Sequence, residues 1–432
     1  MVIRWLLVST PGTVPSPIPP DARRARWAVS MIFFLNGASF CAILPRYPEM
    51  VEQIGLSNAA FGLAVGFGPV GGLLAGLLAA PLMARWGSGR AAVTMQVVAS
   101  TSHVLIYTAG SWLWLALSLF LASAADAITD ISMNAHGMRV ERRYRRSIMN
   151  SYHGWWSLGA VSGGILGASA AQVGIPLWLQ GALGIVVFGT LAVASYRFML
   201  PGHDSTEREV ASASPASGAD VPGPSRARGV RRRLLAGNSG RGLLLILALG
   251  AVLIFAGATE DAGGTWGALF MTRTFDSTPF VAGLAFVALQ GAQTIGRFTG
   301  DAVVDRLGDR RTAQYGALLS AAGMSFALLV PHPATALVGF ACAGLGVATL
   351  FPAAFRAADD MEGVAHGVGI TLVGWLARVG FFVTPPIVGA LADVFTLRYA
   401  LWLVPVYALG ILLFSPALEH NPRRGAGPAF RS

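Results

Sequence analysis

Lysine is absent from this 432-residue chain, and all 31 of its basic residues are arginine. The phosphate-binding loop of ATPases needs a lysine, so no ATPase motif of that kind is present. Cysteine is scarce as well, because Cys41 and Cys342 are the only two. Two cysteines are too few for a disulfide framework or a cysteine-rich zinc site. Since catalytic motifs such as H-E-x-x-H and G-x-S-x-G are also missing, we predict a non-enzyme without metal or cofactor.

Charged residues make up only 12% of the chain, about half of the roughly 25% that soluble domains carry. Apolar residues make up 54%, which favours a membrane protein. The net charge of +10 comes from arginines that lie between long apolar runs. We therefore interpret the charge as a signal of membrane topology and expect no nucleic-acid partner.

Twelve apolar runs are long enough to span a bilayer, which takes about 20 residues. We predict an all-α polytopic protein with these spans: 27–46, 57–83, 91–109, 112–138, 147–170, 175–198, 242–271, 279–304, 312–330, 334–355, 366–391 and 396–415. The predicted organisation is a disordered tail (1–26), a six-helix half (27–199), a flexible linker (200–240), a second six-helix half (241–416) and a tail (417–432).

Arginine is distributed unequally between the two sides of the predicted membrane. With the N-terminus inside, 26 arginines fall on the cytoplasmic side, and only Arg46, Arg273 and Arg398 fall outside. This bias predicts a multi-pass protein of the bacterial cytoplasmic membrane with both termini in the cytoplasm.

Carboxylates interrupt the fourth apolar run. Asp126, Asp130 and Asn134 are spaced by four residues, so they share one helical face. Asp126 lies 13 residues before Arg139, roughly 20 Å from the inner boundary at about 1.5 Å per residue. Charges at such depth usually face a partner or a watery path, so they either form a structural pair or bind protons or substrate.

Further polar residues lie in other apolar runs, and each group has two possible roles. Asn150 and His153 open the fifth run, as a proton relay or as helix-capping groups. Glu260 and Asp261 precede Gly263 and Gly264, which should loosen the helix near a binding site, unless this is a solvated helix end.

Span eight carries a polar stripe made of Gln290, Gln293, Thr294 and Arg297. Arg297 lies near the inner end, where it could reach water or pair with Asp301. Arg378 lies too deep to reach water easily, so it pairs with an acidic residue or binds an anion.

Asn36 gives the first run a polar face, and Trp156 and Trp266 either stack on a flat ligand or pack structurally. Glycines spaced by four residues allow close helix contact, either as sliding surfaces between the halves or as static packing. They are Gly68, Gly72, Gly76, Gly159, Gly163 and Gly167.

A loop motif occurs twice, after the second span of each half. Arg85, Gly87 and Arg90 align with Arg306, Gly308 and Arg311, and Asp305 and Arg310 complete the second copy. Such a repeat implies a duplicated fold. The motif resembles the signature loop of the major facilitator superfamily, which braces the cytoplasmic helix ends in one conformation. Ala84 stands where that family usually has an aspartate.

Three further segments resemble the fucose-permease-like branch of that superfamily: residues 33–50, 126–143 and 151–167. Glu260 and Trp266 match the helix-seven pattern of the branch, while Thr265 replaces its common aspartate. This resemblance implies transport of small polar solutes such as sugars.

We therefore predict a secondary active transporter that works as a monomer in a lipid bilayer. Its buried carboxylates Asp126, Asp130 or Glu260 would couple the movement of a small-molecule substrate to protons. Two alternatives stay open, namely proton-antiport efflux of drugs or metabolites, and a non-transporting receptor or scaffold on a transporter fold.

Overall fold

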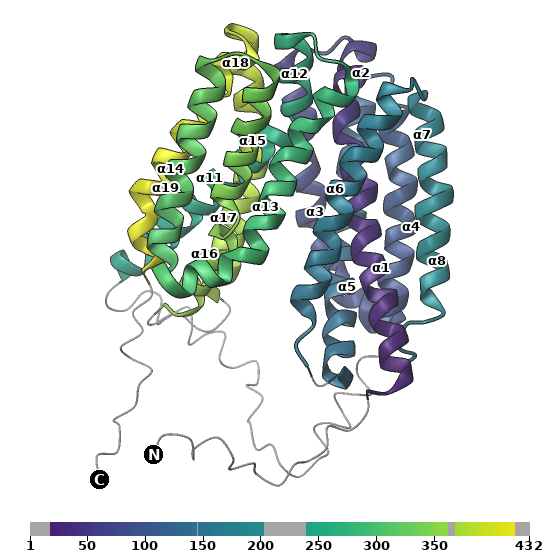
Figure 1. Ribbon diagram of the computed structural model, residues 1–432. Helices are drawn as coiled ribbons and strands as arrows, with labels where there is room; N and C mark the ends of the chain where they lie inside the picture. The colour runs from purple at the N-terminus through teal and green to yellow at the C-terminus, as the bar shows by residue number, and fades with distance from the viewer. Residues whose placement is uncertain (1–17, 145, 203–238, 362–367, 420–432) are drawn as a thin grey trace, which may run out of the picture.

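The computed structural model describes residues 18–144, 146–202, 239–361 and 368–419, and every regular element in these ranges is helical. Figure 1 shows two bundles of helices side by side, one in purple to teal and the other in green to yellow. Residue 202 leaves the first bundle and Ser239 starts the second at the same end of the molecule, which we call the linker end (downward in Figure 1). The opposite end is called the far end (upward in Figure 1).

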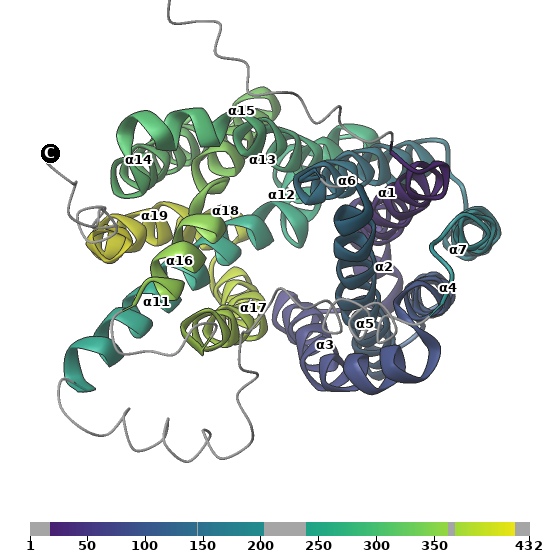
Figure 2. The same ribbon diagram turned by 90° about the horizontal axis from the view of Figure 1, so that it is seen from below.

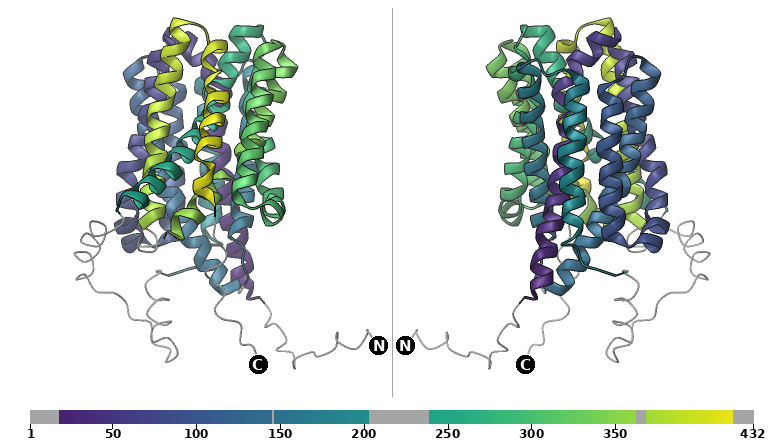
Figure 3. Two further views of the ribbon diagram at one scale, coloured as in Figure 1. Left: turned by 90° about the vertical axis from the view of Figure 1, so that its left-hand side faces the viewer. Right: turned by 90° about the vertical axis from the view of Figure 1, so that its right-hand side faces the viewer.

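The first bundle contains the helices up to residue 196. They are α1 (Pro20–Cys41), α2 (Tyr47–Ile54), α3 (Asn58–Trp86), α4 (Ser88–Tyr107), α5 (Trp112–Tyr144), α6 (Met149–Gln172), α7 (Leu177–Gly184) and α8 (Thr190–Tyr196). In Figure 3 the purple α1 and the blue α5 extend furthest at the linker end.

The second bundle repeats this arrangement, as the view along the helices in Figure 2 shows. Its helices are α11 (Ser239–Gly264), α12 (Gly267–Phe275), α13 (Pro279–Leu307), α14 (Asp309–Leu329), α15 (Pro333–Val347), α16 (Leu350–Asp359), α17 (Val368–Val394), α18 (Leu397–Ala400) and α19 (Leu403–Phe414).

Within the described residues, nine helical stretches are long and apolar enough to cross a membrane. The other three predicted spans correspond to α4, α6 and α14, which have the length but not the same apolarity. The structure thus places helix in every predicted range, and the count of twelve spans stays a prediction.

The first helix begins earlier than expected, because residues 20–26 belong to α1 and not to a disordered tail. Pro20 suits the first turn of a helix, where its missing N–H group needs no partner. Asp21 then accepts a bond from Arg143 at 2.6 Å, and Arg26 donates to the Tyr144 hydroxyl at 3.2 Å. These bonds hold the start of α1 against the end of α5.

The repeated loops have the same backbone geometry in both bundles. Gly87 and Gly308 both have φ = +79°, a left-handed region that favours glycine. The two residues are 221 positions apart, and the 29-residue helices α3 and α13 begin with the same offset. The sequence repeat is therefore a structural repeat.

Glycines bring helices into backbone contact inside each bundle. A Cβ atom added to Gly159, Gly163 or Gly167 of α6 would lie only 2.1–2.3 Å from carbonyl oxygens of α1. Gly68 and Gly72 of α3 face α5 less closely, since added Cβ atoms would lie 2.9 Å from Ser123 Oγ and 3.3 Å from the Ser123 carbonyl oxygen. The idea that these glycines form sliding surfaces between the halves is therefore wrong, because both stripes pack within the first bundle.

Arg139, counted among the cytoplasmic arginines, is almost wholly buried at 2% exposure. Its guanidinium donates to the carbonyl oxygens of Leu200, Pro201 and Gly202 at 3.4, 2.5 and 3.0 Å. His136, one turn earlier on α5, accepts the backbone N–H of Leu200 at 3.2 Å. These bonds tie the last described residues before the linker to α5.

We expect Gly163→Ala to lower the free energy of unfolding by about 1–3 kcal/mol, because the added methyl group would lie 2.3 Å from the Ala38 carbonyl oxygen. Gly76→Ala is the matched control, since its Cβ would meet only Ile131 Cδ1, at 3.7 Å. Thermal unfolding of the purified variants in detergent measures the difference. Equal melting temperatures for the two variants would contradict the packing described here.

Candidate functional site

Asn36 of α1 is the centre of a polar cluster inside the first bundle, which we call the Asn36 cluster (Asn36, Gln96, Asp126 and Trp156). Its amide nitrogen donates to Asp126 Oδ1 at 2.7 Å and to Gln96 Oε1 at 3.4 Å. Its amide oxygen accepts from Trp156 Nε1 at 2.9 Å. The cluster thus joins four helices, α1, α4, α5 and α6, through one side chain.

Gln96 has no exposed surface and was not singled out in the sequence. Its amide nitrogen lies 3.3 Å from Ser39 Oγ and 3.5 Å from Ser100 Oγ. A glutamine inside a predicted span can indicate a buried polar contact. No motif in the surrounding sequence, however, singles out Gln96. Asp126, by contrast, remains partly exposed.

Asp130 lies one turn closer to the linker end and is exposed. Asn134 donates to Asp130 Oδ1 at 3.0 Å, so the face predicted from their spacing is formed. Arg378 of α17, in the other bundle, is also exposed and attracts Asp130 electrostatically. Among the described residues Arg378 makes no hydrogen bond or ion pair.

Glu260 of α11 forms the matching cluster in the second bundle. Gln293 of α13 donates to Glu260 Oε1 in a short hydrogen bond, and Arg297 Nη2 lies 3.7 Å from the same oxygen. Of the two alternatives for Arg297, the pairing with Asp301 is therefore wrong, because Arg297 pairs with Glu260. Arg297 follows Gln293 by one turn, so both point at α11, while Asp301 is exposed.

His153 and Asn150 are exposed near the linker end of α6. The His153 ring meets Phe33 edge to face, with 5.4 Å between the ring centroids. His153 also lies within electrostatic range of Arg297 in the second bundle. These residues therefore lie along the seam between the bundles, on the linker side of Glu260.

The far end of α11 breaks after Gly264, as its glycines predict, and α12 starts at Gly267. Asp261 Oδ1 accepts from Thr265 Oγ1 at 2.5 Å. Gln290 of α13 is 7% exposed, and its amide nitrogen has no partner among the described residues.

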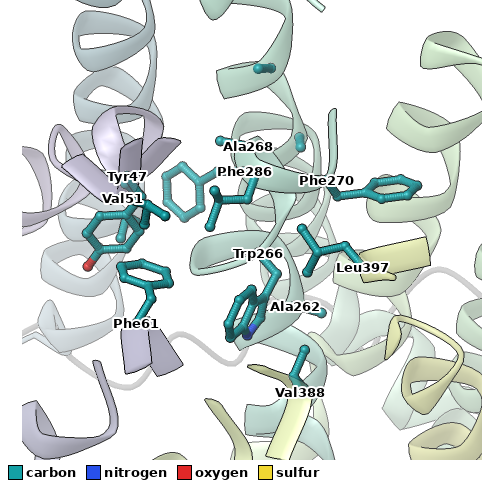
Figure 4. Packing of buried hydrophobic residues seen from close by; sticks show 14 of the residues in the cluster. Tyr47, Val51, Phe61, Ala262, Trp266, Ala268, Phe270, Phe286, Val388 and Leu397 are labelled. Atoms are coloured by element: carbon teal, nitrogen blue, oxygen red, sulfur yellow. The ribbon is translucent and has the colours of Figure 1, made fainter. Parts of the chain in front are cut away.

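Trp266 follows this break and has no exposed surface. Its ring meets Phe61 of α3 edge to face at 5.6 Å, and Phe61 meets Tyr47 at 5.0 Å. Figure 4 shows these three rings packed between the bundles, with Ala262 and Val388 beside them. Trp266 was expected along the substrate path, but here it belongs to an aromatic closure between the bundles.

Hydrogen bonds between the two bundles are concentrated at the far end. Asp393 accepts the backbone N–H groups of Asn58 and Ala59, both at 2.8 Å, and Gln172 accepts that of Phe280 at 3.1 Å. At the linker end, the ion pairs of the second bundle join Arg310 to Glu419 and Arg356 to Asp309. Those pairs stay within one bundle, so the far end is the closed end.

The signature loops lie at the linker end and are mostly exposed. Arg85 and Arg90 of the first copy and Asp305, Arg306 and Arg311 of the second are exposed, and Arg310 is bonded to Glu419. In the parts of the chain described, neither loop makes a hydrogen bond or ion pair with the other bundle, so these loops form no brace between the bundles in this conformation.

A separate cavity of about 570 Å³ lies between α6 and α13. Its lining is largely apolar and includes Trp155, Leu158 and Phe298, with Ser151 and Thr294 as its hydroxyl groups. It contains no member of the Asn36 cluster and not Glu260. The cavity is therefore distinct from the polar clusters.

Comparison with known proteins agrees with this architecture. The family model of the Major Facilitator Superfamily matches residues 29–260 and 251–430. Membrane protein MosC of Rhizobium meliloti is 28% identical over 409 residues, which cover 95% of this chain and 93% of that protein. An uncharacterised MFS-type transporter of Yersinia pestis is 26% identical, covering 88% and 92%.

Two solved structures share the fold at low identity. The nucleoside transporter NupG matches with a TM-score of 0.67 and 11% identity, and the match covers 92% of this chain and 100% of that chain. A bacterial homologue of the human lysosomal transporter Spinster, in an inward-facing and unoccupied conformation, has a TM-score of 0.69 and 15% identity, covering 93% and 99%.

Two apolar helical bundles with polar clusters inside them are the architecture of a multi-pass membrane protein. The family and the relatives make it a membrane transporter and not an enzyme. The chain belongs to the major facilitator superfamily, whose model matches most of its length. The finer resemblance to the fucose-permease-like branch stays a prediction.

We expect Asn36→Ala to lower the free energy of unfolding by about 1–3 kcal/mol, because it leaves Trp156 Nε1 and Gln96 without their partner inside the bundle. Asn134→Ala is the control, since the Asn134 amide bonds only within its own helix, to Asp130. Thermal unfolding in detergent checks both. A melting temperature of Asn36→Ala as high as that of Asn134→Ala would show that the cluster does not hold the bundle.

Proposed function

We propose that this protein is a secondary active transporter that moves a small polar solute across the bacterial cytoplasmic membrane by alternating access, coupled to protons. One observation carries the proposal: Asn36 with Asp126 in one bundle, and Gln293 with Glu260 in the other, place amides and carboxylates inside otherwise apolar helices. Such groups are costly in a bilayer, so they are retained where they bind solute or protons.

The chemistry of these clusters suits a hydroxyl-rich solute. Amide side chains donate and accept hydrogen bonds at once, as sugars and nucleosides require. The structural neighbour NupG is a nucleoside transporter, and the branch resemblance points to sugars, so both support a polar solute. The amides therefore favour a hydroxyl-rich solute, and the transport assay below identifies which one is moved.

The arginine bias supports a cytoplasmic linker end and cytoplasmic termini. With that orientation, the closed far end faces outside and the conformation is inward-facing. Asp130, His153 and Arg378 are then exposed toward the cytoplasm, as a solute-release path requires. A single chain contains both clusters, so we propose that the monomer transports.

Proton coupling is assigned to Asp126, Asp130 or Glu260. Each carboxylate lies in a spanning helix and can change its charge when a solute or a counter-charge arrives. Arg378 faces Asp130 across the bundles, so an anionic group on the solute would compete with Asp130 for the same guanidinium.

Efflux of apolar compounds by proton antiport is the second candidate, and the cavity between α6 and α13 favours it. That cavity is lined by side chains that suit an apolar compound arriving from the bilayer. A non-transporting receptor or scaffold is the third reading, to which Ala84 in the first signature loop lends some support.

The first test is proton movement in proteoliposomes that contain a pH-sensitive dye. We expect addition of a sugar or nucleoside to change the internal pH, and Asp126→Asn to lower this signal at least tenfold, because an amide cannot carry a proton at this position. Asp276→Asn, an exposed change at the far end, is the control. The sign of the signal separates symport from antiport.

The same assay decides among the candidates. A signal with cationic drugs alone favours efflux. Silence with sugars, nucleosides, organic anions and drugs, in protein that is folded and inserted, contradicts the proposed coupling and favours the receptor or scaffold.

A further prediction concerns Arg378. We expect Arg378→Ala to lower solute flux at least tenfold while the protein stays inserted, because its guanidinium makes no ion pair among the described residues and lies within electrostatic range of Asp130. Arg24→Ala, an exposed arginine on α1, should leave flux unchanged. Radiolabelled solute uptake measures both, and equal flux in the two variants would remove Arg378 from the path.

A further inference from the structure

The start of α3 is completed by a residue of the other bundle. The first N–H groups of a helix have no partner within it and need acceptors from elsewhere. Ser57 supplies one acceptor, since its side-chain hydroxyl accepts from Ala60 N at 3.1 Å. Asp393 of α17 supplies two more, because its Oδ1 accepts from Asn58 N and its Oδ2 accepts from Ala59 N, both at 2.8 Å.

Two more contacts strengthen this junction. The Asn58 side chain donates to Asp393 Oδ1 at 2.8 Å, and Arg273 of α12 donates to Asn58 Oδ1. Gly389, one turn before Asp393, brings the backbones together, since a Cβ added there would lie 2.3 Å from the Asn58 carbonyl oxygen. We call Asp393, Asn58, Ala59 and Arg273 the Asp393 latch.

The structural repeat places a neutral counterpart on the other seam. Gln172 Oε1 of α6 accepts Phe280 N at the start of α13, at 3.1 Å. Both partners lie 221 positions from those of the latch, since Gln172 corresponds to Asp393 and Ala59 to Phe280. On one seam the helix N-terminus is capped by a carboxylate that accepts two backbone hydrogen bonds. On the other seam it is capped by an amide that accepts one.

We infer that the Asp393 latch holds the far ends of the two halves together, and that its release is required before the transporter opens at that end. A carboxylate at a helix N-terminus is attracted by the positive end of the helix dipole, and its hydrogen bonds are stronger than those of a neutral amide. The amide seam at Gln172 is the weaker of the two. The linker end carries no corresponding bond between the bundles among the described residues.

Distances between spin labels at the linker end test this inference without any solute. Thr94 and Tyr315 are exposed, lie one in each bundle and are related by the 221-residue repeat, so cysteines there report on the separation of the halves. The background carries Cys41→Ala and Cys342→Ala. The measurement is pulsed electron spin resonance on the full chain in nanodiscs.

Asp393→Asn keeps the shape of the side chain and removes its charge. As the far ends part, the linker ends should approach, so we expect the ratio of short to long distances to rise about tenfold. Adding Gln172→Glu to this variant places a carboxylate on the other seam and should reverse part of the change. Asp276→Asn, an exposed carboxylate of the same end with φ = +49° that asparagine tolerates, should change nothing.

An unchanged distribution in folded Asp393→Asn and Asp393→Ala overturns the inference, and so does an equal shift in Asp276→Asn. If the Asp393 variants do not fold, Asn58→Ala and Arg273→Ala remove the side-chain part of the latch. They should shift the ratio in the same direction by a smaller factor, and no shift in either overturns the inference. The inference rests on alternating access, but a failure of solute transport or proton coupling would leave these distances unaffected.

Discussion

Polar atoms inside a bilayer have no water to bond, and each unsatisfied one costs several kcal/mol. This constraint explains why Asn36 is bonded to three helices other than its own and why Glu260 is bonded to Gln293. The polar clusters fix how neighbouring helices are rotated, because each amide must meet its partner. The same groups are then available where the bundles face one another.

Close packing inside the bundles follows from the same environment. Lipid tails are as apolar as leucine, so helices associate through van der Waals contact and interhelical bonds rather than through a hydrophobic drive. Gly163 against Ala38, and Gly344 against Leu289, let backbones touch within a bundle. Between the bundles, Phe61 meets Trp266, and backbones also touch at the far end, where a Cβ added to Gly389 would lie 2.3 Å from the Asn58 carbonyl oxygen. Motion of one bundle against the other therefore has to separate close contacts at that end.

Much of this fold could be predicted from the sequence, because apolar runs and arginine bias depend on the membrane alone. The shared face of Asp130 and Asn134, and the break after Gly264, followed from local spacing. The partner of Arg297 could not be predicted, since periodicity gives the face of a helix and not the neighbour that it meets. For the same reason the role of Gln96 and the burial of Trp266 became visible only when the helices were packed.

The contacts of Arg139 have a mechanical consequence. Because Arg139 donates to the carbonyl oxygens of residues 200–202, this part of the chain is fixed to α5. Helix α5 also carries Asp126 and Asp130. Any displacement of α5 therefore moves residues 200–202 and both carboxylates together, so the end of the first bundle and these two side chains share a single moving part.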